Sequence, residues 1–167
     1  MTRPDPIEVV EERRDAALRV LVNAVPYIRF LGVAFDRRED ELTGVLRYKE
    51  ALLGNPALPA LHGGATAAFL EVTAMTTLTW ATLWPDLEAG GRDVAMLRGD
   101  IPARLPKTID ITVDYLRPGL PRDAYARARI NRAGRRYASV HVEGWQDNRD
   151  RLFAQATGHF LMPPQPE

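Results

Sequence analysis

A short apolar stretch of the chain begins with residues whose types and spacing suit chemistry on a carbonyl group. It reads HGGATAAFLEVTAMTTLTW over residues 62–80. Glycines at the first positions of a helix leave backbone amides uncovered, and these amides, reinforced by the helix dipole, favour a negatively charged oxygen. Gly63 and Gly64 are therefore candidates for an oxyanion hole. An ordinary packing role for the two glycines is the alternative.

Glu71 is the one charged side chain in this stretch. It follows Gly64 by seven residues, close to two helical turns, so the two share one face of a helix. Its neighbours one turn away are all apolar: Ala67, Ala68, Ala74 and Met75. A carboxylate in apolar surroundings suits a general base or a nucleophile. A polar, solvated edge of the helix is the alternative.

The spacing of Gly64 and Glu71 also predicts an assembly. Seven residues separate them by roughly 10 Å along a helix axis. A base and an oxyanion hole that serve one carbonyl must converge on it, and a single helix can hardly supply both. Two antiparallel copies of the helix would place Glu71 of one copy against the glycines of the other. We therefore predict a homodimer, or a dimer of dimers, with composite sites at its interface.

The first half of the chain is expected to supply two helices and two strands. Apolar residues recur with helical spacing from Pro6 to about Val25, and Pro26 is expected to end that helix. FLGVAF (30–35) and ELTGVLRY (41–48) read as strands on either side of a charged turn. The spacing over 63–83 predicts a long helix that ends at Pro85.

The second half reads as four strands. KTIDITVDYLRPG (107–119) alternates, with Ile109, Ile111, Val113 and Tyr115 on one face and Thr108 on the other. Residues 123–146 form two strands around a turn at 132–134, and 151–162 form the last strand. The expected inward face is rich in small residues: Ala126, Ala128, Ile130, Ala138, Val140, Val142, Gly144, Leu152, Ala154, Ala156, Gly158 and Phe160. Small residues let a helix lie close to the sheet.

Together these elements predict an α+β fold, a six-stranded antiparallel sheet wrapped around the central helix 63–83. We expect a single domain overall, with an N-terminal helical extension over 1–29 and the main domain over 30–167. The connection 85–107 does not fit this scheme, because it exceeds 20 residues and is rich in proline and glycine. Such a segment is either a functional lid or a disordered surface insertion.

Composition excludes several function classes. Lysine plus arginine and aspartate plus glutamate both number 22, so no global field favours nucleic acid. The chain has no cysteine, which excludes disulfides and a cysteine nucleophile and is compatible with a cytoplasmic location. Its three histidines are dispersed, and His141 and His159 fall on the outward face of their strands, so no metal site is expected. No segment is apolar over the length of a membrane span.

The HGG motif with an acid nine residues after its histidine, followed by VDYLRPG and a closing RAGRR meander, resembles the hotdog-fold acyl-CoA thioesterases of the PaaI-like group. The resemblance covers about residues 30–162. It implies hydrolysis of an acyl-CoA without a further cofactor, since coenzyme A is part of the substrate. Many relatives carry aspartate at the acid position, whereas this chain carries Glu71.

The resemblance also implies roles for individual residues. Glu71 would be the catalytic carboxylate, acting directly on the thioester or through water. The Gly64 amide, with that of Gly63, would polarise the carbonyl, and His62 would orient the substrate near the thiol leaving group. Asn55 is the candidate for an asparagine that orients water or carbonyl. It lies seven residues before His62, one more than usual, so a structural turn is its alternative role.

Other side chains are candidates for substrate binding. Thr73, Thr76 and Thr77 could each lend a hydroxyl to the site, or bond back to a carbonyl one turn earlier. Arginines that could hold the phosphates of coenzyme A follow the strands of the second half: Arg117, Arg127, Arg129, Arg132, Arg135 and Arg136. Solvated strand faces and a charged turn are the alternative for these arginines.

Two other functions on the same fold remain in competition with hydrolysis. A non-catalytic acyl-CoA sensor would not need the acid, and the extension before residue 30 has room for one helix only. A hydratase or dehydratase would resemble hotdog enzymes that carry an aspartate–histidine pair on a separate loop, which we do not find. A serine esterase is disfavoured because the chain has no GxSxG motif.

Overall fold

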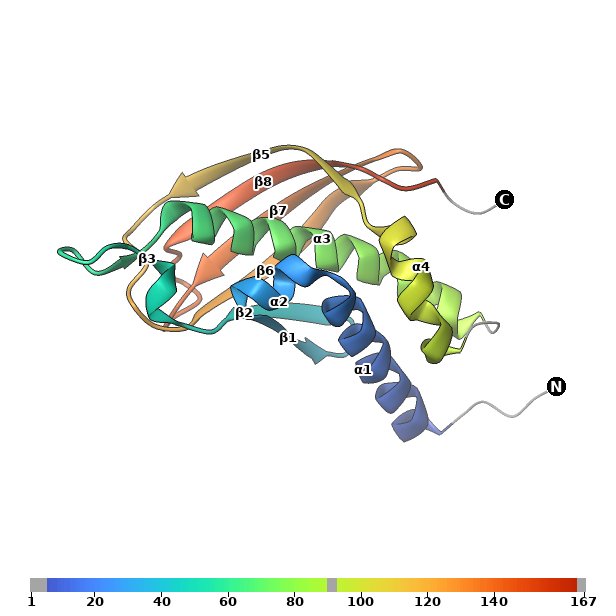
Figure 1. Cartoon of the computed structure of the whole chain (residues 1–167). Helices are drawn as coiled ribbons and strands as arrows, with labels where there is room; N and C mark the ends of the chain where they lie inside the picture. The colour runs from blue at the N-terminus through green and yellow to red at the C-terminus, as the bar shows by residue number, and fades with distance from the viewer. Residues whose placement is uncertain (1–5, 90–92, 165–167) are drawn as a thin grey trace.

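The computed structural model describes residues 6–89 and 93–164, so residues 1–5 of the predicted extension lie outside the described part. Its strands in the main sheet are β1 (Val33–Arg38), β2 (Glu41–Leu46), β5 (Lys107–Tyr115), β6 (Ala124–Ala133), β7 (Tyr137–Trp145) and β8 (Ala154–Leu161). They form a six-stranded antiparallel sheet in the order β1-β2-β6-β7-β8-β5. The sheet curves around one long helix, α3 (Gly63–Glu88), as Figure 1 shows. The predicted α+β architecture is confirmed.

The inward face of β6, β7 and β8 matches the predicted alternation, except that Leu152 lies before β8 and Phe153 is the buried residue at that point. Ala126, Ala138, Ala154 and Gly144 are buried under α3. At Gly44 in β2 an added Cβ would lie only 2.7 Å from the Thr73 hydroxyl and 3.2 Å from the Phe69 ring. The small residues therefore permit the close approach of helix and sheet that their pattern predicts.

Helix α3 is longer than predicted. It continues through Pro85 to Glu88 instead of ending before the proline. A proline inside a helix removes one hydrogen bond and costs about 3 kcal/mol. Here Trp84 and Leu87, on either side of Pro85, are buried in an apolar cluster with neighbouring helices, and this packing keeps the chain helical.

The N-terminal region forms two helices where one was predicted. The first, α1 (Ile7–Ala24), is confirmed within one residue at either end. Pro26 does not lead into a strand but occupies the first position of a short helix, α2 (Pro26–Leu31). Proline is well suited to this position because its missing N–H has no partner there. Gly32, at φ 77°, ends α2, so the first strand begins at Val33 and not at residue 30.

The connection 85–107 is largely ordered, so the alternative of a disordered surface insertion is wrong in its described part. It contains a short 3-10 helix, η2 (Val94–Met96), and the helix α4 (Leu97–Arg104), while residues 90–92 lie outside the described residues. Leu97 and Ile101 are fully buried against α1 and the end of α3. In Figure 1 α4 lies beside the C-terminal end of α3. The segment is thus part of a second apolar core.

A small hairpin precedes α3 and was not predicted. The 3-10 helix η1 (Glu50–Leu52) leads into β3 (Leu53–Asn55), which pairs with β4 (Ala60–Leu61). Strand β4 ends one residue before His62. Among the described residues, no helix combines the length and apolarity that a membrane span requires.

Candidate active site

His62 is the cap of α3 and lies between β4 and the first helical turn. Its backbone N–H donates to Leu52 O over 2.7 Å, which ties it to η1. Its Nδ1 accepts the N–H of Gly64 over 2.9 Å. Because Nδ1 accepts, a neutral imidazole carries its proton on Nε2. His62 is exposed, so this second N–H is available to a ligand.

The prediction of two free amides needs correction at Gly64. The His62 imidazole already satisfies the Gly64 N–H, so an incoming oxygen would have to displace it. The Gly63 N–H has no acceptor among the described residues, as expected for the first position of a helix. The Gly63 carbonyl accepts the Tyr115 hydroxyl over 2.8 Å. The helix terminus is therefore one open amide beside a capped one.

Glu71 lies on the side of α3 that faces the edge strand β5. It is partly buried, and its neighbours Ala67, Ala68 and Met75 are partly buried as well. Its carboxylate Oε1 accepts a hydrogen bond of 2.5 Å from the Thr108 hydroxyl in the edge strand β5. The acid is therefore neither in the core nor free in solvent, but held at the open edge of the sheet.

Thr108 reaches Glu71 because β5 is irregular, and the predicted alternation is wrong at this end of the strand. The pairing with β8 shifts between Thr108 and Asp110, which leaves Ile109 as the extra residue of a β-bulge. A bulge reverses the side-chain alternation beyond it. Thr108 consequently turns inward and Ile109 outward, with 55% of its surface exposed.

Asn55 has the structural-turn role, one of its two predicted alternatives. Its side-chain oxygen accepts the backbone N–H of Ala57 over 2.9 Å and that of Leu58 over 3.4 Å, at the tip of the β3–β4 hairpin. This is the pattern of an Asx turn. The side chain is exposed at the hairpin tip, where its acceptor is already used.

The three candidate threonines of α3, Thr73, Thr76 and Thr77, lie away from the face that carries Glu71. Thr73 is fully buried and its hydroxyl bonds back to Phe69 O over 2.8 Å, the alternative role considered from the sequence. Thr76 is also buried in the core. The Thr77 hydroxyl is buried and has no partner among the described residues. Six residues after Glu71, Thr77 lies about 120° around the helix from it.

The candidate phosphate-binding arginines do not form one patch. Arg117 follows β5 near Tyr115, which contacts Gly63. Arg132, Arg135 and Arg136 lie at the β6–β7 turn, and Arg135 lines a groove of about 810 Å³ with the C-terminal half of α3 and α4. The groove residue Thr82 is 19 positions after Gly63, or roughly 28 Å along the axis.

Two other arginines considered from the sequence, Arg127 and Arg129, lie in β6. Arg127 donates to Glu41 over 2.7 Å and to Thr43 over 2.8 Å on the outer face of the sheet. Arg129 is exposed.

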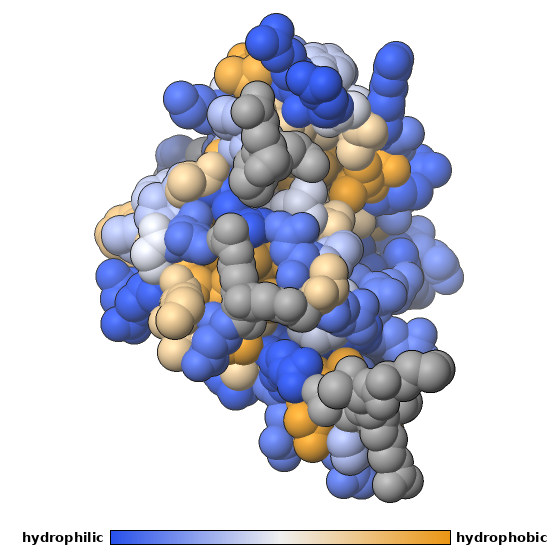
Figure 2. Space-filling model, turned by 90° about the vertical axis from the view of Figure 1, so that its right-hand side faces the viewer, coloured by the Kyte–Doolittle hydropathy of each residue, from blue (hydrophilic) through white to orange (hydrophobic). Residues whose placement is uncertain are grey.

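Figure 2, which views the molecule from the side of α4 and the C-terminal end of α3, shows a mainly hydrophilic surface with small apolar patches.

The remaining histidines are also on the outer face, as predicted. His159 pairs with Asp110 over 2.7 Å and stacks on Tyr137. His141 lies 3.4 Å from the Thr157 hydroxyl. Within 6–89 and 93–164, no group of three or more histidine, cysteine, aspartate or glutamate side chains is arranged to hold a metal ion.

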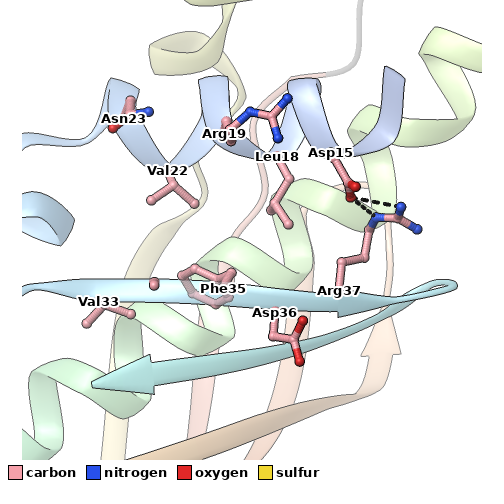
Figure 3. A pocket seen from close by; sticks show the side chains of 10 residues that line it. Asp15, Leu18, Arg19, Val22, Asn23, Val33, Phe35, Asp36 and Arg37 are labelled. Atoms are coloured by element: carbon pink, nitrogen blue, oxygen red, sulfur yellow. Dashed lines mark hydrogen bonds and ion pairs between the residues drawn. The ribbon is translucent and has the colours of Figure 1, made fainter. Parts of the chain in front are cut away.

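A second hollow, of about 380 Å³, lies between α1 and β1 (Figure 3). Leu18, Val22 and Phe35 form its apolar floor, while Arg37 at one end is held by Glu11 and Asp15. Burial alone would lower the pKa of Arg37, but the hydrogen bonds and charges of the two carboxylates outweigh burial and raise it above its ordinary value. This ion cluster joins α1 to the sheet and contains none of the predicted site residues.

Sequence reasoning missed two residues at the site. Tyr115 was placed on the inward face, but its contact with the helix terminus was not foreseen. Thr108 was placed on the wrong face. Its only sequence signal is that a hydroxyl residue begins a strand of alternating pattern, and a bulge leaves no further mark in that pattern.

Comparison with known proteins agrees with this geometry. A family model described as the acyl-CoA thioesterase N-terminal domain matches residues 55–162, more than half of the chain. The medium/long-chain acyl-CoA thioesterase YigI of Escherichia coli (strain K12) is 31% identical over 147 residues, which cover 86% of this chain and 89% of YigI.

Two solved structures share the architecture. A Shewanella oneidensis protein related to the thioesterase superfamily has 25% identity and a TM-score of 0.72, covering 95% of this chain and 99% of its own. A phenylacetic acid degradation-related protein of Ralstonia eutropha JMP134 has 23% identity and a TM-score of 0.63, over 90% and 99% of the two chains, and supports the fold alone. With this sheet, this central helix and these relatives, the chain belongs to the hotdog-fold acyl-CoA thioesterase family.

Proposed function

We propose that the chain hydrolyses medium- or long-chain acyl-CoA to the free acid and coenzyme A, with Glu71 as the catalytic carboxylate. The observation that carries the proposal is the position of Glu71. It is a partly buried acid on the open face of α3, with one oxygen held by Thr108. Thioester hydrolysis is the activity of the family, and the chain-length class is that of its relative YigI.

The proposed chemistry uses the carboxylate oxygen that Thr108 leaves free. That oxygen either removes a proton from water, which attacks the thioester carbon, or attacks the carbon itself to give an anhydride that water then cleaves. In both routes the carbon–sulfur bond breaks and the thiolate of coenzyme A takes up a proton. The Gly63 amide and the Nε2–H of His62 are the proposed hydrogen-bond donors to the developing oxyanion and to the leaving group.

The site is proposed to be completed by a second copy of the chain. Gly64 and Glu71 lie roughly 10 Å apart along the axis, so one helix does not bring both to one carbonyl. The helix between them carries two small, partly buried residues, Ala67 and Ala68. Strand β5 is an edge strand of the sheet, with no strand on its outer side among the described residues. A second copy that packs antiparallel on this face would align Glu71 with the partner's helix terminus.

The bound coenzyme A is proposed to have its phosphates at arginines. Arg117 is the candidate at the end of α3 that carries His62. Arg135 lines the groove at the other end, and Arg132 and Arg136 lie near it in the chain; none of the three has an ion pair among the described residues. Replacement of Arg117 by alanine would raise KM and leave kcat unchanged if it holds a phosphate.

The direct experiment is hydrolysis of an acyl-CoA series by the wild type and by Glu71→Gln. We expect the amide to lower kcat by about 10²- to 10⁴-fold, because it can neither accept the proton nor attack. Glu143→Gln, on the outer face of the sheet, is the matched control and should retain full activity. A Glu71→Gln variant that turns over like the wild type would remove Glu71 from the mechanism.

A non-catalytic acyl-CoA-binding protein is the second candidate function. One observation favours it: the Gly64 amide, which the sequence predicted as an oxyanion donor, is already bound by His62. Acyl-CoA that binds the wild type without release of thiol, across the whole chain-length series, would support this second function and contradict hydrolysis. Sedimentation under the same conditions tests the assembly, because an active monomer would contradict the composite site.

A further inference from the structure

The hairpin β3–β4 ends in a tip of four consecutive apolar residues, all of them exposed: Pro56, Ala57, Leu58 and Pro59. Leu58 has 73% of its surface exposed. In Figure 1 the hairpin projects beyond the N-terminal end of α3, at the opposite end of the helix from α4. An exposed apolar run of this length is a fault in a surface unless another surface covers it. We propose that the tip (residues 56–59) docks in the groove between α3 and α4 of a second copy of the chain.

The tip has a fixed shape before any partner is present. The Asn55 side chain accepts the backbone N–H of Ala57 over 2.9 Å and that of Leu58 over 3.4 Å. Pro56 and Pro59 restrict the backbone on either side of Leu58. A segment that is already ordered loses little conformational entropy when it binds. The turn role of Asn55 thus serves to present Leu58 as a rigid apolar knob.

The groove offers this knob a mainly apolar surface. Its volume is about 810 Å³, and its apolar lining includes Ala81, Pro85, Ala103, Ala133, Met162 and Pro163. Asp86 and Arg104 in the groove are paired with each other over 2.7 Å. The Thr82 hydroxyl donates to Thr79 O over 3.0 Å. Because these polar groups have partners within the chain, an apolar occupant can cover them without breaking a contact.

The proposed antiparallel pair brings the tip to the level of that groove, so the docking rests on the proposed function. When the helix terminus of one copy lies beside the partner's Glu71, Gly63 lies roughly level with residue 72 of the partner. Leu58 precedes Gly63 by five residues, which reach roughly 12 to 16 Å beyond the terminus. That distance equals about 8 to 11 residues of helix rise, so the tip lies level with roughly residues 80–83 of the partner. Ala81 in this interval lines the groove.

A pair of introduced cysteines tests the contact, since the chain has none of its own. Leu58→Cys and Ala81→Cys would lie at least roughly 27 Å apart within one chain, whereas a disulfide needs Cα atoms within about 7 Å. Oxidation of the double variant is therefore expected to give a covalent dimer on a non-reducing gel. A mixture of the two single variants should give the same product. Ile7→Cys with Ala81→Cys, which uses an exposed apolar position at the start of α1, is the matched control and should stay uncrosslinked.

Leu58→Ala measures what the knob contributes to assembly. We expect the dissociation constant of the dimer in analytical ultracentrifugation to rise by about 10- to 100-fold, as for loss of a buried leucine side chain. Ile7→Ala should leave this constant unchanged. Leu58 is exposed in the single chain, so thermal unfolding at low protein concentration should match that of the wild type.

The outcomes separate the docking from the function on which it rests. A dimer that forms no disulfide between positions 58 and 81 would overturn the docking and leave the proposed function standing. An unchanged dissociation constant for Leu58→Ala would overturn it too, because the tip would then be free for a different partner. A monomeric wild type that hydrolyses acyl-CoA would overturn the docking together with the composite site. Full activity of Glu71→Gln in a dimer that does crosslink would instead overturn the proposed catalytic role and keep the docking.

Discussion

The two halves of α3 are held in different ways. The first half packs Phe69 and Leu70 into the core under the sheet and in addition makes directed polar contacts: His62 caps Gly64, Tyr115 binds the Gly63 carbonyl, and Thr108 binds Glu71. The second half lies in a cluster of apolar side chains from α1, from α4 and from α3 itself. Leu83 and Ile101 in this cluster are both fully buried. The first half of α3, which carries His62 and Glu71, keeps one side open. The second half is covered on that side by α1 and α4.

This difference predicts that the second half governs stability and the first half governs activity. Undirected apolar packing contributes in proportion to the area and volume that are filled. Directed contacts at a helix terminus contribute less to stability, but they set the positions of the groups that would meet a substrate.

The largest effect on stability is expected from Leu83→Ala in the closed half. The fully buried side chain leaves a cavity, so the free energy of unfolding should fall by about 2–5 kcal/mol. Urea unfolding measures this, and kcat per folded molecule should stay at the wild-type value. Leu83→Met, which conserves volume, is the control and should cost under about 1.5 kcal/mol. A loss of kcat in folded Leu83→Ala would break the division between the halves.

Gly54→Ala tests the open half. Its added Cβ would lie 2.9 Å from His62 Cα, a backbone atom that cannot swing aside. We expect unfolding to become easier by about 1–3 kcal/mol, as in other overpacked sites, and kcat to fall because the cap of α3 shifts. Gly99→Ala in α4 is the matched control: an added Cβ there meets no atom within 4 Å, so activity should be unchanged. Equal activity of the two variants would contradict the prediction.

A smaller effect is expected from Tyr115→Phe. The change removes a 2.8 Å hydrogen bond to the Gly63 carbonyl at a side chain that is 56% exposed. The free energy of unfolding should fall by about 0.5–1 kcal/mol, because water replaces the lost donor. Denaturant titration measures the loss, and steady-state kinetics should show a change of only a few fold. A loss as large as that of Leu83→Ala would mean that this end also depends on one contact for its stability.

The smallest effect concerns Asp123, which holds the end of β2 near the same end of α3. The backbone N–H of Tyr48, and after it the Arg47 guanidinium, lower the pKa of Asp123 below its ordinary value. The ionised group therefore stabilises the fold above the ordinary pKa of aspartate, and this stabilisation is lost as the pH falls through the lower folded-state pKa. Asp123→Asn should cost about 0.5 kcal/mol at pH 7 and progressively less below pH 3.8. A difference from wild type that grows on acidification would contradict the assignment.

Much of the fold could be predicted because its signals are local. The small inward residues of β6 to β8 alternate with period two, and the apolar residues of α3 recur with helical spacing. Errors occurred where packing overrode a local rule. Pro85 lies inside α3 because its neighbours are buried, and Pro26, which ends α1 as predicted, also begins the short helix α2 that was not predicted.

The candidate site was predictable only in part. Glu71, His62 and the two glycines stand out by residue type and spacing within one helix. Arg117, at the end of the strand before the hairpin, was grouped with the hairpin arginines as one candidate patch, but the fold separates it from Arg135 by much of the length of α3. The reason is that the two ends of a strand lie at opposite ends of the sheet. Proximity in the sequence does not reveal which strand end lies next to the helix terminus.

The sequence by itself determined the fold class, the family resemblance and the acid on α3, since each depends on residue type and short spacing. Only the tertiary structure decided that Thr108 reaches Glu71, that Tyr115 binds the Gly63 carbonyl and that the 85–107 segment closes a second core. These contacts join residues distant in the chain. Strand register, which one bulge can shift, sets which side chain faces the helix, and the alternation of residues along a strand does not encode that shift.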